Sequence, residues 1–96
     1  MSAMDAYRFR LYVAGDTPNS AHALANLTAL CDSQLPGRHE IEVVDVFREP
    51  GRALAESILM TPTLLKLSPA PVQRIVGTLA DLRTVVLALG LETLIA

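Results

Sequence analysis

The chain has 96 residues, of which 51% are apolar and 19% are charged, and its net charge is −2 at pH 7. This length corresponds to one domain, which buries roughly 60–65% of the surface that its unfolded chain exposes. The chain has no run of basic residues and contains two tyrosines, two phenylalanines and no tryptophan. The composition therefore argues against nucleic acid and anionic membranes as partners.

The N-terminal residues and the single cysteine indicate the cellular compartment in which the protein acts. Residues 1–8 are polar and precede no long apolar segment, so we interpret them as an N-terminal extension rather than a signal peptide, and residues 9–96 as the domain. The longest apolar run, Val85 to Leu91, is too short to span a membrane. Cys31 has no second cysteine with which to form a disulfide. These features predict a cytoplasmic protein.

The first predicted elements are a strand and a helix. Apolar residues alternate with polar or amphipathic ones from Phe9 to Ala14, which predicts a strand. Thr17 is a suitable N-cap and Pro18 suits the first turn of a helix that runs to about Gln34. The apolar stripe of this helix comprises Leu24, Leu27, Cys31 and Leu35, with Leu30 beside it.

A second strand completes a βαβ unit. The segment Ile41 to Phe47 is apolar on both faces except at Asp45, which predicts a central strand covered on both sides. The unit is expected to be parallel and right-handed. A weak amphipathic helix is predicted over Arg52 to Leu59, with Leu54 and Ile58 among its apolar residues.

The stretch Thr61 to Gly77 contains three of the six prolines and supports two interpretations. As strands, Thr63 to Leu67 and Val72 to Val76 form a hairpin around a proline-rich turn. As helices, Thr61 is an N-cap with Pro62 in the first turn, and Ser68-Pro69 repeats that signal.

The last segment is equally ambiguous. Thr78 is a possible helix cap, with Asp81 three residues later as in a capping box. The helix would bury Leu82, Val85, Val86 and Leu89. The same Val85 to Leu89 segment is also acceptable as a buried strand, and Gly90 interrupts either element. If strands are chosen for the proline stretch and a helix for the last segment, the order is βαβαββα, which is the thioredoxin-like arrangement, with Pro62 where that fold carries a cis-proline.

The chain lacks the residues that thioredoxin chemistry requires. Two cysteines normally begin the first helix, where the helix dipole lowers a thiol pKa, but Gly15 to Ser20 contains no sulfur. Cys31 lies in the apolar stripe and is interpreted as a buried small hydrophobe. His22 and His39 have no partners at metal-ligand spacing and are expected at the surface. No enzymatic activity, metal or cofactor is predicted.

The remaining charged and loop residues give weaker signals. The Gly15 loop precedes a helix N-terminus, a place where anions bind, but it lacks the glycine pattern of a dinucleotide site. Arg8, Arg10 and Arg74 either form a modest cationic face or are simply solvated. Asp45 is expected to be a capped or paired carboxylate at the end of a strand rather than a base.

Three sequence blocks resemble the KaiB family of circadian clock proteins. They are Leu11 to Ser20, then Val43 to Val46, then Thr61 to Leu64 together with Pro69 to Gly77, and their order and spacing match over nearly the whole chain. The resemblance implies a non-enzymatic, metamorphic protein with a βαββααβ ground state that forms homodimers or homotetramers. Its rarer βαβαββα monomer binds a KaiC-type ATPase, and KaiA where that protein is present.

The resemblance also implies roles for individual residues. The fold-switch residues are Pro62, Pro69, Pro71, Gly90 and Glu92, of which the last two match the Gly-Leu-Asp hinge of the family with Glu in place of Asp. The partner-binding residues are Lys66, Pro69, Pro71 and Arg74. By this interpretation, the prolines control the change between two folds of the same chain. The strand and helix interpretations of Thr61 to Gly77 then correspond to those two folds.

Two other functions are considered. One is a stably thioredoxin-like adaptor that binds a histidine kinase or another partner and never changes fold. The other is a redox protein that depends on Cys31, and a reductase activity abolished by Cys31→Ser would support it.

Overall fold

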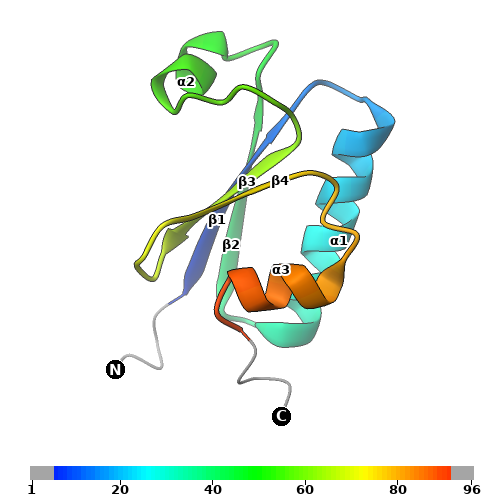
Figure 1. Cartoon of the computed structure of the whole chain (residues 1–96), viewed down its shortest axis with the longest axis vertical. Coiled ribbons are helices and arrows are strands. Elements are labelled where there is room, and N and C mark those ends of the chain that lie inside the picture. Colours follow the sequence, from blue (N-terminus) through cyan, green and yellow to red (C-terminus); the bar gives the residue numbers. More distant parts are fainter. Residues whose placement is uncertain (1–5, 92–96) are drawn as a thin grey trace.

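The computed structural model describes residues 6–91, which form seven elements. In chain order they are β1 (Tyr7–Val13), α1 (Pro18–Gln34), β2 (His39–Asp45), α2 (Pro50–Ala55), β3 (Thr63–Ser68), β4 (Gln73–Val76) and α3 (Leu82–Ala88) (Figure 1). The observed order is therefore βαβαββα, and the predicted thioredoxin-like arrangement is confirmed.

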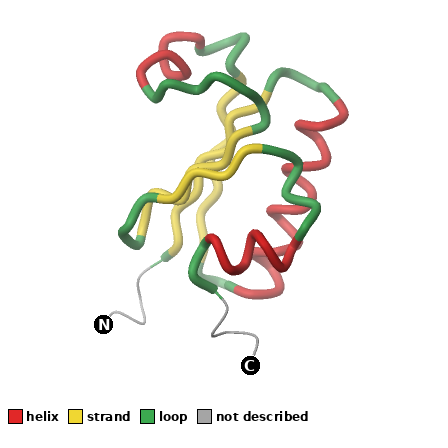
Figure 2. Tube along the Cα trace, in the orientation of Figure 1, coloured by secondary structure: helices red, strands yellow, loops and turns green. Residues whose placement is uncertain are grey.

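The four strands form one sheet in the order β2-β1-β3-β4. Strands β1 and β2 are parallel, as predicted for a βαβ unit, with Leu11 opposite Val43. The other two pairings, β1 with β3 and β3 with β4, are antiparallel. Figures 1 and 2 show α1 and α3 on the same side of the sheet, with α2 beyond one end of the strands.

The main core lies between the sheet and the pair α1 and α3. It contains the buried residues Phe9, Leu11, Val13, Ala23, Leu27, Leu30, Cys31, Leu35, Leu64, Leu79, Val85, Val86, Leu89 and Leu91. The alternation of β1 explains its contribution to this core, because Phe9, Leu11 and Val13 point to one face. Burial of these apolar side chains is the main favourable contribution to folding.

A smaller cluster covers the opposite face of the sheet. Tyr12, Val44 and Leu65 are buried there, and Val46, Ile58 and Leu67 pack around them. Tyr12 was expected on an amphipathic face, yet it is fully buried, and its hydroxyl group has no hydrogen-bond partner among the described residues. At its carboxyl end β1 is thus buried on both faces, which is the pattern of a central strand, while Arg8 and Arg10 keep the rest of the second face polar.

The prediction that the second strand is central and covered is wrong. β2 spans His39–Asp45 rather than residues 41–47, and it forms an edge of the sheet with β1 as its single neighbour. Val44 is buried, but Val43 is 44% exposed. The apolar residues of β2 are divided between its two faces, because Ile41 packs against the main core and Val44 is buried in the second cluster.

Helix α1 has the predicted bounds, but two of its details differ. The hydroxyl group of Thr17 donates to Ser20 Oγ, 2.9 Å away, and makes no cap hydrogen bond to the helix backbone. Leu24, expected in the apolar stripe, is 36% exposed, and Ala23 occupies the buried position instead. The buried face is rotated because the small Ala23 fits closest to the sheet.

The hairpin prediction is confirmed, with strands 63–68 and 73–76 in place of 63–67 and 72–76. Helix α2 ends at Ala55 rather than at residue 59, because Ser57 has a φ of +57°, which no right-handed helix accommodates. The ambiguous last segment is a helix, and its N-cap is Asp81 rather than Thr78. The Asp81 carboxylate accepts a hydrogen bond from the backbone N–H of Thr84.

Candidate interaction site

The carboxyl ends of β1 and β2 meet at a cleft of about 590 Å³ beside the start of α1, where a thioredoxin carries its cysteines. The Asp45 carboxylate accepts hydrogen bonds from the N–H groups of Gly15 and Phe47, at 3.2 and 2.9 Å. It thereby joins the loop before α1 to the loop after β2. The prediction of a paired strand-end carboxylate is confirmed, and Asp45 holds two loops together.

Cys31 is fully buried in the main core, as predicted. Burial raises the pKa of its thiol to about 12, with a smaller contribution from Asp32. At neutral pH the group is a neutral thiol, which is a poor nucleophile. The residues described contain no group of three potential metal ligands.

His39, expected in a surface loop, is the first residue of β2, and its Nδ1 lies 2.8 Å from Leu35 O.

The three prolines assigned to fold switching lie along the β3–β4 hairpin. Pro62 is buried just before β3, Pro69 is half-buried and Pro71 is exposed in the turn. All three are preceded by cis peptide bonds, and the expected cis-proline before the third strand is thus present. Only Pro69 and Pro71 are accessible in this fold, at the end of the hairpin far from α2 (Figure 1).

Lys66 lies in β3, between β1 and β4, and is 4% exposed. Its Nζ is 5.9 Å from the centroid of the Tyr7 ring, within reach of a cation–π contact. Among residues 6–91 no carboxylate is paired with it, and burial lowers its pKa. As the only lysine of the chain, Lys66 is a buried cation without a counter-charge in the described structure.

Arg74 lies in β4, with its side chain directed towards α2. Its guanidinium donates to the carbonyl oxygens of Glu56 and Ser57, at 2.8 and 3.3 Å. These carbonyls follow the last turn of α2, so Arg74 places a positive charge at the C-terminal end of that helix. The predicted partner-binding pair is therefore divided, because Lys66 is enclosed and Arg74 is exposed.

Gly90 ends α3 in a Schellman motif. Its φ is +76°, its N–H donates to Leu87 O, and the N–H of Leu91 donates to Val86 O. Gly90 therefore lies outside the helix, in a left-handed conformation that glycine adopts without strain. The other predicted hinge residue, Glu92, lies outside the described residues.

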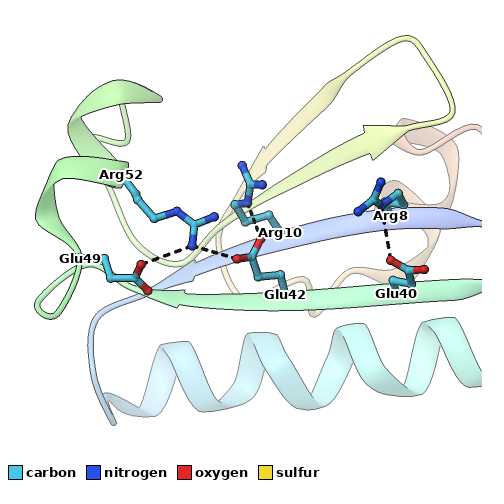
Figure 3. Close-up of polar contacts among 6 residues, drawn as sticks. All are labelled: Arg8, Arg10, Glu40, Glu42, Glu49 and Arg52. Atoms are coloured by element: carbon cyan, nitrogen blue, oxygen red, sulfur yellow. Dashed lines mark hydrogen bonds and ion pairs between the residues drawn. The ribbon is translucent and has the colours of Figure 1, made fainter.

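An ion-pair network covers the face of the sheet opposite α1 (Figure 3). Glu42 of β2 binds both Arg10 of β1 and Arg52 of α2, each at 2.8 Å, and Arg52 also approaches Glu49 at 3.4 Å. Arg52 and then Arg10 lower the pKa of the Glu42 carboxyl to about 2. The network joins α2 to the sheet.

Of the two alternatives considered for Arg8, Arg10 and Arg74, a shared cationic face is not present among the described residues. Arg8 forms an ion pair with Glu40 at 3.4 Å, separate from the network of Glu42 (Figure 3). Arg10 is paired with Glu42. Of the three arginines proposed for this face, Arg74 alone contacts no carboxylate in the described residues, and it bonds to backbone carbonyls.

Sequence analysis missed an exposed apolar surface around α2. Leu54 on α2 and Leu59 after it are 80% and 91% exposed, although both were predicted to form the apolar face of a longer helix. Phe47 before α2 and Met60 before β3 are exposed as well. We call these four residues the α2 apolar surface. The early end of α2, caused by the conformation of Ser57, prevents the predicted helix face from forming.

Comparisons with known families and sequences agree with this description. The KaiB domain profile matches residues 10–91. The chain is 43% identical to the circadian clock oscillator protein KaiB of Prochlorococcus marinus strain MIT 9312 over 91 residues, covering 95% of this chain and 87% of the relative. It is also 43% identical to the protein of the same description from Synechococcus sp. strain RCC307, covering 95% and 83% of the two chains.

Solved structures resemble the fold at lower sequence identity. The N-terminal domain of Synechococcus elongatus SasA matches with a TM-score of 0.73 and 20% identity, over 90% of this chain and 85% of that domain. Mitochondrial thioredoxin 3 of Saccharomyces cerevisiae matches with a TM-score of 0.68 and 16% identity, over 93% and 79%. These likenesses establish a thioredoxin-like fold, and the profile match with the sequence identities establishes that the chain belongs to the KaiB family of circadian clock proteins.

Proposed function

We propose that this chain is a non-enzymatic regulator that acts in the cytoplasm by binding a KaiC-type ATPase as a thioredoxin-like monomer. Binding would regulate the phosphorylation cycle of the ATPase in circadian or stress timing. KaiA is a further partner where it is present. The βαββααβ order, as a homodimer or homotetramer, is the proposed storage form of the same chain.

The observation that carries this proposal is the KaiB match over residues 10–91 on a chain with thioredoxin-like order. The start of α1 has no cysteine, and the single thiol of the chain is buried, so the residues present favour binding over thiol chemistry. The likeness to the N-terminal domain of SasA supports the thioredoxin-like order, and the KaiB family match supports a clock protein. A free energy difference of a few kcal/mol between two folds is enough for a partner to select one of them.

Two surfaces are candidates for the contact with the ATPase. The hairpin surface contains the predicted residues Pro69 and Pro71, while Arg74 bonds to the carbonyl oxygens that follow α2 and Lys66 is enclosed in β3. The α2 apolar surface lies at the opposite end of the sheet and exposes large apolar side chains of the kind that form interface centres. We assign the energetic centre of the interface to the α2 apolar surface and a peripheral contact to the hairpin.

The experiment measures binding of the purified chain to a purified KaiC-type ATPase by analytical ultracentrifugation with ATP present. Leu54→Asp is expected to weaken the complex by roughly a hundredfold, as for a central apolar residue, and Pro71→Asp by roughly tenfold. Leu87→Asp is the matched control, because Leu87 is an exposed leucine on α3. No complex with the unmodified chain would refute the proposed function, and equal effects of Leu54→Asp and Leu87→Asp would refute the assignment of the surface.

A stably thioredoxin-like adaptor is the second candidate. It is favoured by the observed fold itself and by the likeness to the N-terminal domain of SasA. Such an adaptor would remain a monomer with one set of NMR signals at every concentration and temperature. A second set of signals would contradict it.

A further inference from the structure

Among the described residues 6–91, strand β4 is an unpaired edge of the sheet. Gly77 N–H donates to Pro62 O at 2.9 Å, and Val76 lies opposite Thr63. Bonded and non-bonded pairs alternate in an antiparallel ladder, so Gln73, Ile75 and Gly77 direct their backbone groups towards β3. The N–H and C=O groups of Arg74 and Val76 therefore point away from the sheet. Another extended backbone is the partner that can form hydrogen bonds with all of these groups at once.

A groove of about 350 Å³ runs beside this edge. It is lined by β4, the following loop and α3, and its apolar lining residues are Ile75, Val76, Leu79, Ala80 and Val85. Ile75 also packs against the main core. A strand added to β4 would place alternate side chains over this groove, as strands added to a sheet edge beside a helix do in peptide-binding domains.

The face of β4 that points away from the groove carries a positive charge, which an added strand would meet with its other row of side chains. Arg74 is the only charged residue of β4, and it points to the face away from the groove because it lies opposite Leu65 of the second cluster. Its hydrogen bonds go to two neutral carbonyl oxygens, and the described residues 6–91 place no carboxylate in an ion pair with it. The charge remains available to an acidic side chain of an added strand.

We propose that the β4 edge and its groove bind an extended segment of a partner protein that alternates apolar and acidic residues. The segment adds to the sheet as a fifth strand, its apolar side chains enter the groove beside α3, and an acidic side chain meets Arg74. Only two of the four residues of β4 direct backbone N–H and C=O groups outward, so hydrogen bonds to this edge alone give limited affinity. Apolar contacts in the groove supply the rest of the binding free energy. This surface adjoins the α2 apolar surface at Arg74, whose guanidinium bonds to Glu56 and Ser57, but its groove lies beside α3 and the proposal does not depend on the proposed function.

Defined peptides test the proposal. The probe is a fluorescein-labelled octapeptide of four Val-Glu repeats, and the matched control contains four Val-Lys repeats. Binding of the full chain is measured by fluorescence anisotropy and by ¹⁵N–¹H NMR. We expect the acidic peptide to bind at least about tenfold more tightly than the basic one, as opposite charges across a strand pair require. We also expect Arg74 and Val76 amides to gain protection from hydrogen exchange.

Two variants act on the two halves of the surface. Val76→Pro removes an outward N–H without removing a bond to β3, and Val76→Thr keeps that N–H as the control. Ala80→Trp fills the groove from an exposed loop position, and Ala80→Ser is its control. Val76→Pro and Ala80→Trp should each weaken binding of the acidic peptide roughly tenfold. Val76→Thr and Ala80→Ser should leave that binding unchanged. Ala80→Trp keeps the test valid if Val76→Pro perturbs the fold.

Three results would overturn the proposal. The first is the absence of saturable binding of the acidic peptide, and the second is binding that both Val76→Pro and Ala80→Trp leave intact. The third is a map of NMR changes centred on the other edge, β2, where Glu40 and Glu42 lie. Changes at Arg74 and Val76 that depend on protein concentration without peptide would instead assign the edge to a second copy of the chain, and would also overturn it.

Discussion

At the scale of single residues, Lys66 carries the least favourable charge of the described structure. It is 4% exposed, contacts the Tyr7 ring and has no carboxylate partner among residues 6–91. A buried cation without a counter-charge costs free energy, and replacing it by an apolar side chain of similar length removes that cost. Sequence alone predicted Lys66 as a binding residue and gave no signal of its burial, because burial depends on how β1 and β4 enclose β3.

We predict that Lys66→Met raises the free energy of unfolding of this form by about 1 kcal/mol at pH 7. The folded pKa of Lys66 is lowered from its ordinary value of 10.5. The unmodified protein therefore gains stability as pH rises through the folded pKa towards 10.5, and the gain is complete only above 10.5, where the lysine is neutral in both states. The advantage of the Met variant should shrink over that range, as measured by urea denaturation at pH 7 and pH 10.5. An advantage that stays constant with pH would show that the charge is not its cause.

Glu42 is a second residue whose ionisation affects stability. Its carboxyl binds Arg52 and Arg10, and its pKa falls from 4.5 to about 2 on folding. The group is 47% exposed, so solvent screening reduces the value of both pairs. A depressed folded pKa gives stability that is complete above pH 4.5 and is lost as pH falls towards 2.

We predict that Glu42→Gln lowers the free energy of unfolding at pH 7 by at most about 1 kcal/mol. The loss should be smaller in 1 M salt and should vanish near pH 2. Glu40→Gln is the matched control, because Glu40 pairs with Arg8 on the same strands but does not contact α2. Denaturant titrations at two pH values and two salt concentrations measure both variants. If Glu40→Gln and Glu42→Gln have the same effect, the link to α2 contributes nothing.

At the scale of elements, the sequence pattern of α3 predicted a capped helix correctly but placed the cap at the wrong residue. Both Thr78 and Asp81 are residues that cap helices. The structure uses Asp81, because Leu79, with a φ of +63°, redirects the chain after Thr78. Asp81 accepts hydrogen bonds from the N–H and the hydroxyl group of Thr84, which lower the pKa of its carboxyl.

We predict that Asp81→Ala increases amide exchange in the first turn of α3, while Thr78→Ala leaves it unchanged. Asp81→Asn should retain most of the protection, because asparagine also caps helices. Lowering the pH below 3.8, the ordinary value for this carboxyl, should gradually reproduce the effect of Asp81→Ala in the unmodified protein. Hydrogen-exchange mass spectrometry or NMR measures these changes. Greater exchange in Thr78→Ala than in Asp81→Ala would refute the assignment of the cap.

Most element types could be predicted from sequence, and the sheet position of β2 and the length of α2 could not. Hydrophobic alternation and N-terminal prolines predicted β1, α1 and the hairpin within two residues of the observed bounds. The apolar sequence of β2 resembles that of a central strand, since sequence does not record which strand lies beside it. The candidate site was predicted only at the hairpin, because the exposure of Leu54 and Leu59 follows from the backbone at Ser57.

At the scale of the whole molecule, the two halves of the chain differ in how firmly sequence specifies them. Residues up to Asp45 supported one interpretation, a βαβ unit, and the structure contains it. The stretch Thr61 to Gly77 supported strands or helices, and Val85 to Leu89 supported a helix or a strand. The structure contains one combination, and the βαββααβ order implied by the KaiB family resemblance requires the opposite one, with a strand in place of α2 as well. A change of fold would therefore be confined to the second half.

We predict that raising the protein concentration produces a second set of NMR signals in slow exchange, in step with a homodimer or homotetramer in sedimentation. In that set, Cα chemical shifts of the hairpin strands β3 and β4 should change from strand to helix values, and those of α2 and α3 from helix to strand values. The shifts of β1 and α1 should keep their type, because one interpretation alone fits that half. Mass action favours the oligomeric fold at high concentration, and an added KaiC-type ATPase should restore the first set. A second set in which α1 also changes type, or an oligomer whose β3, β4 and α3 shifts remain as in the monomer, would contradict a switch confined to the second half.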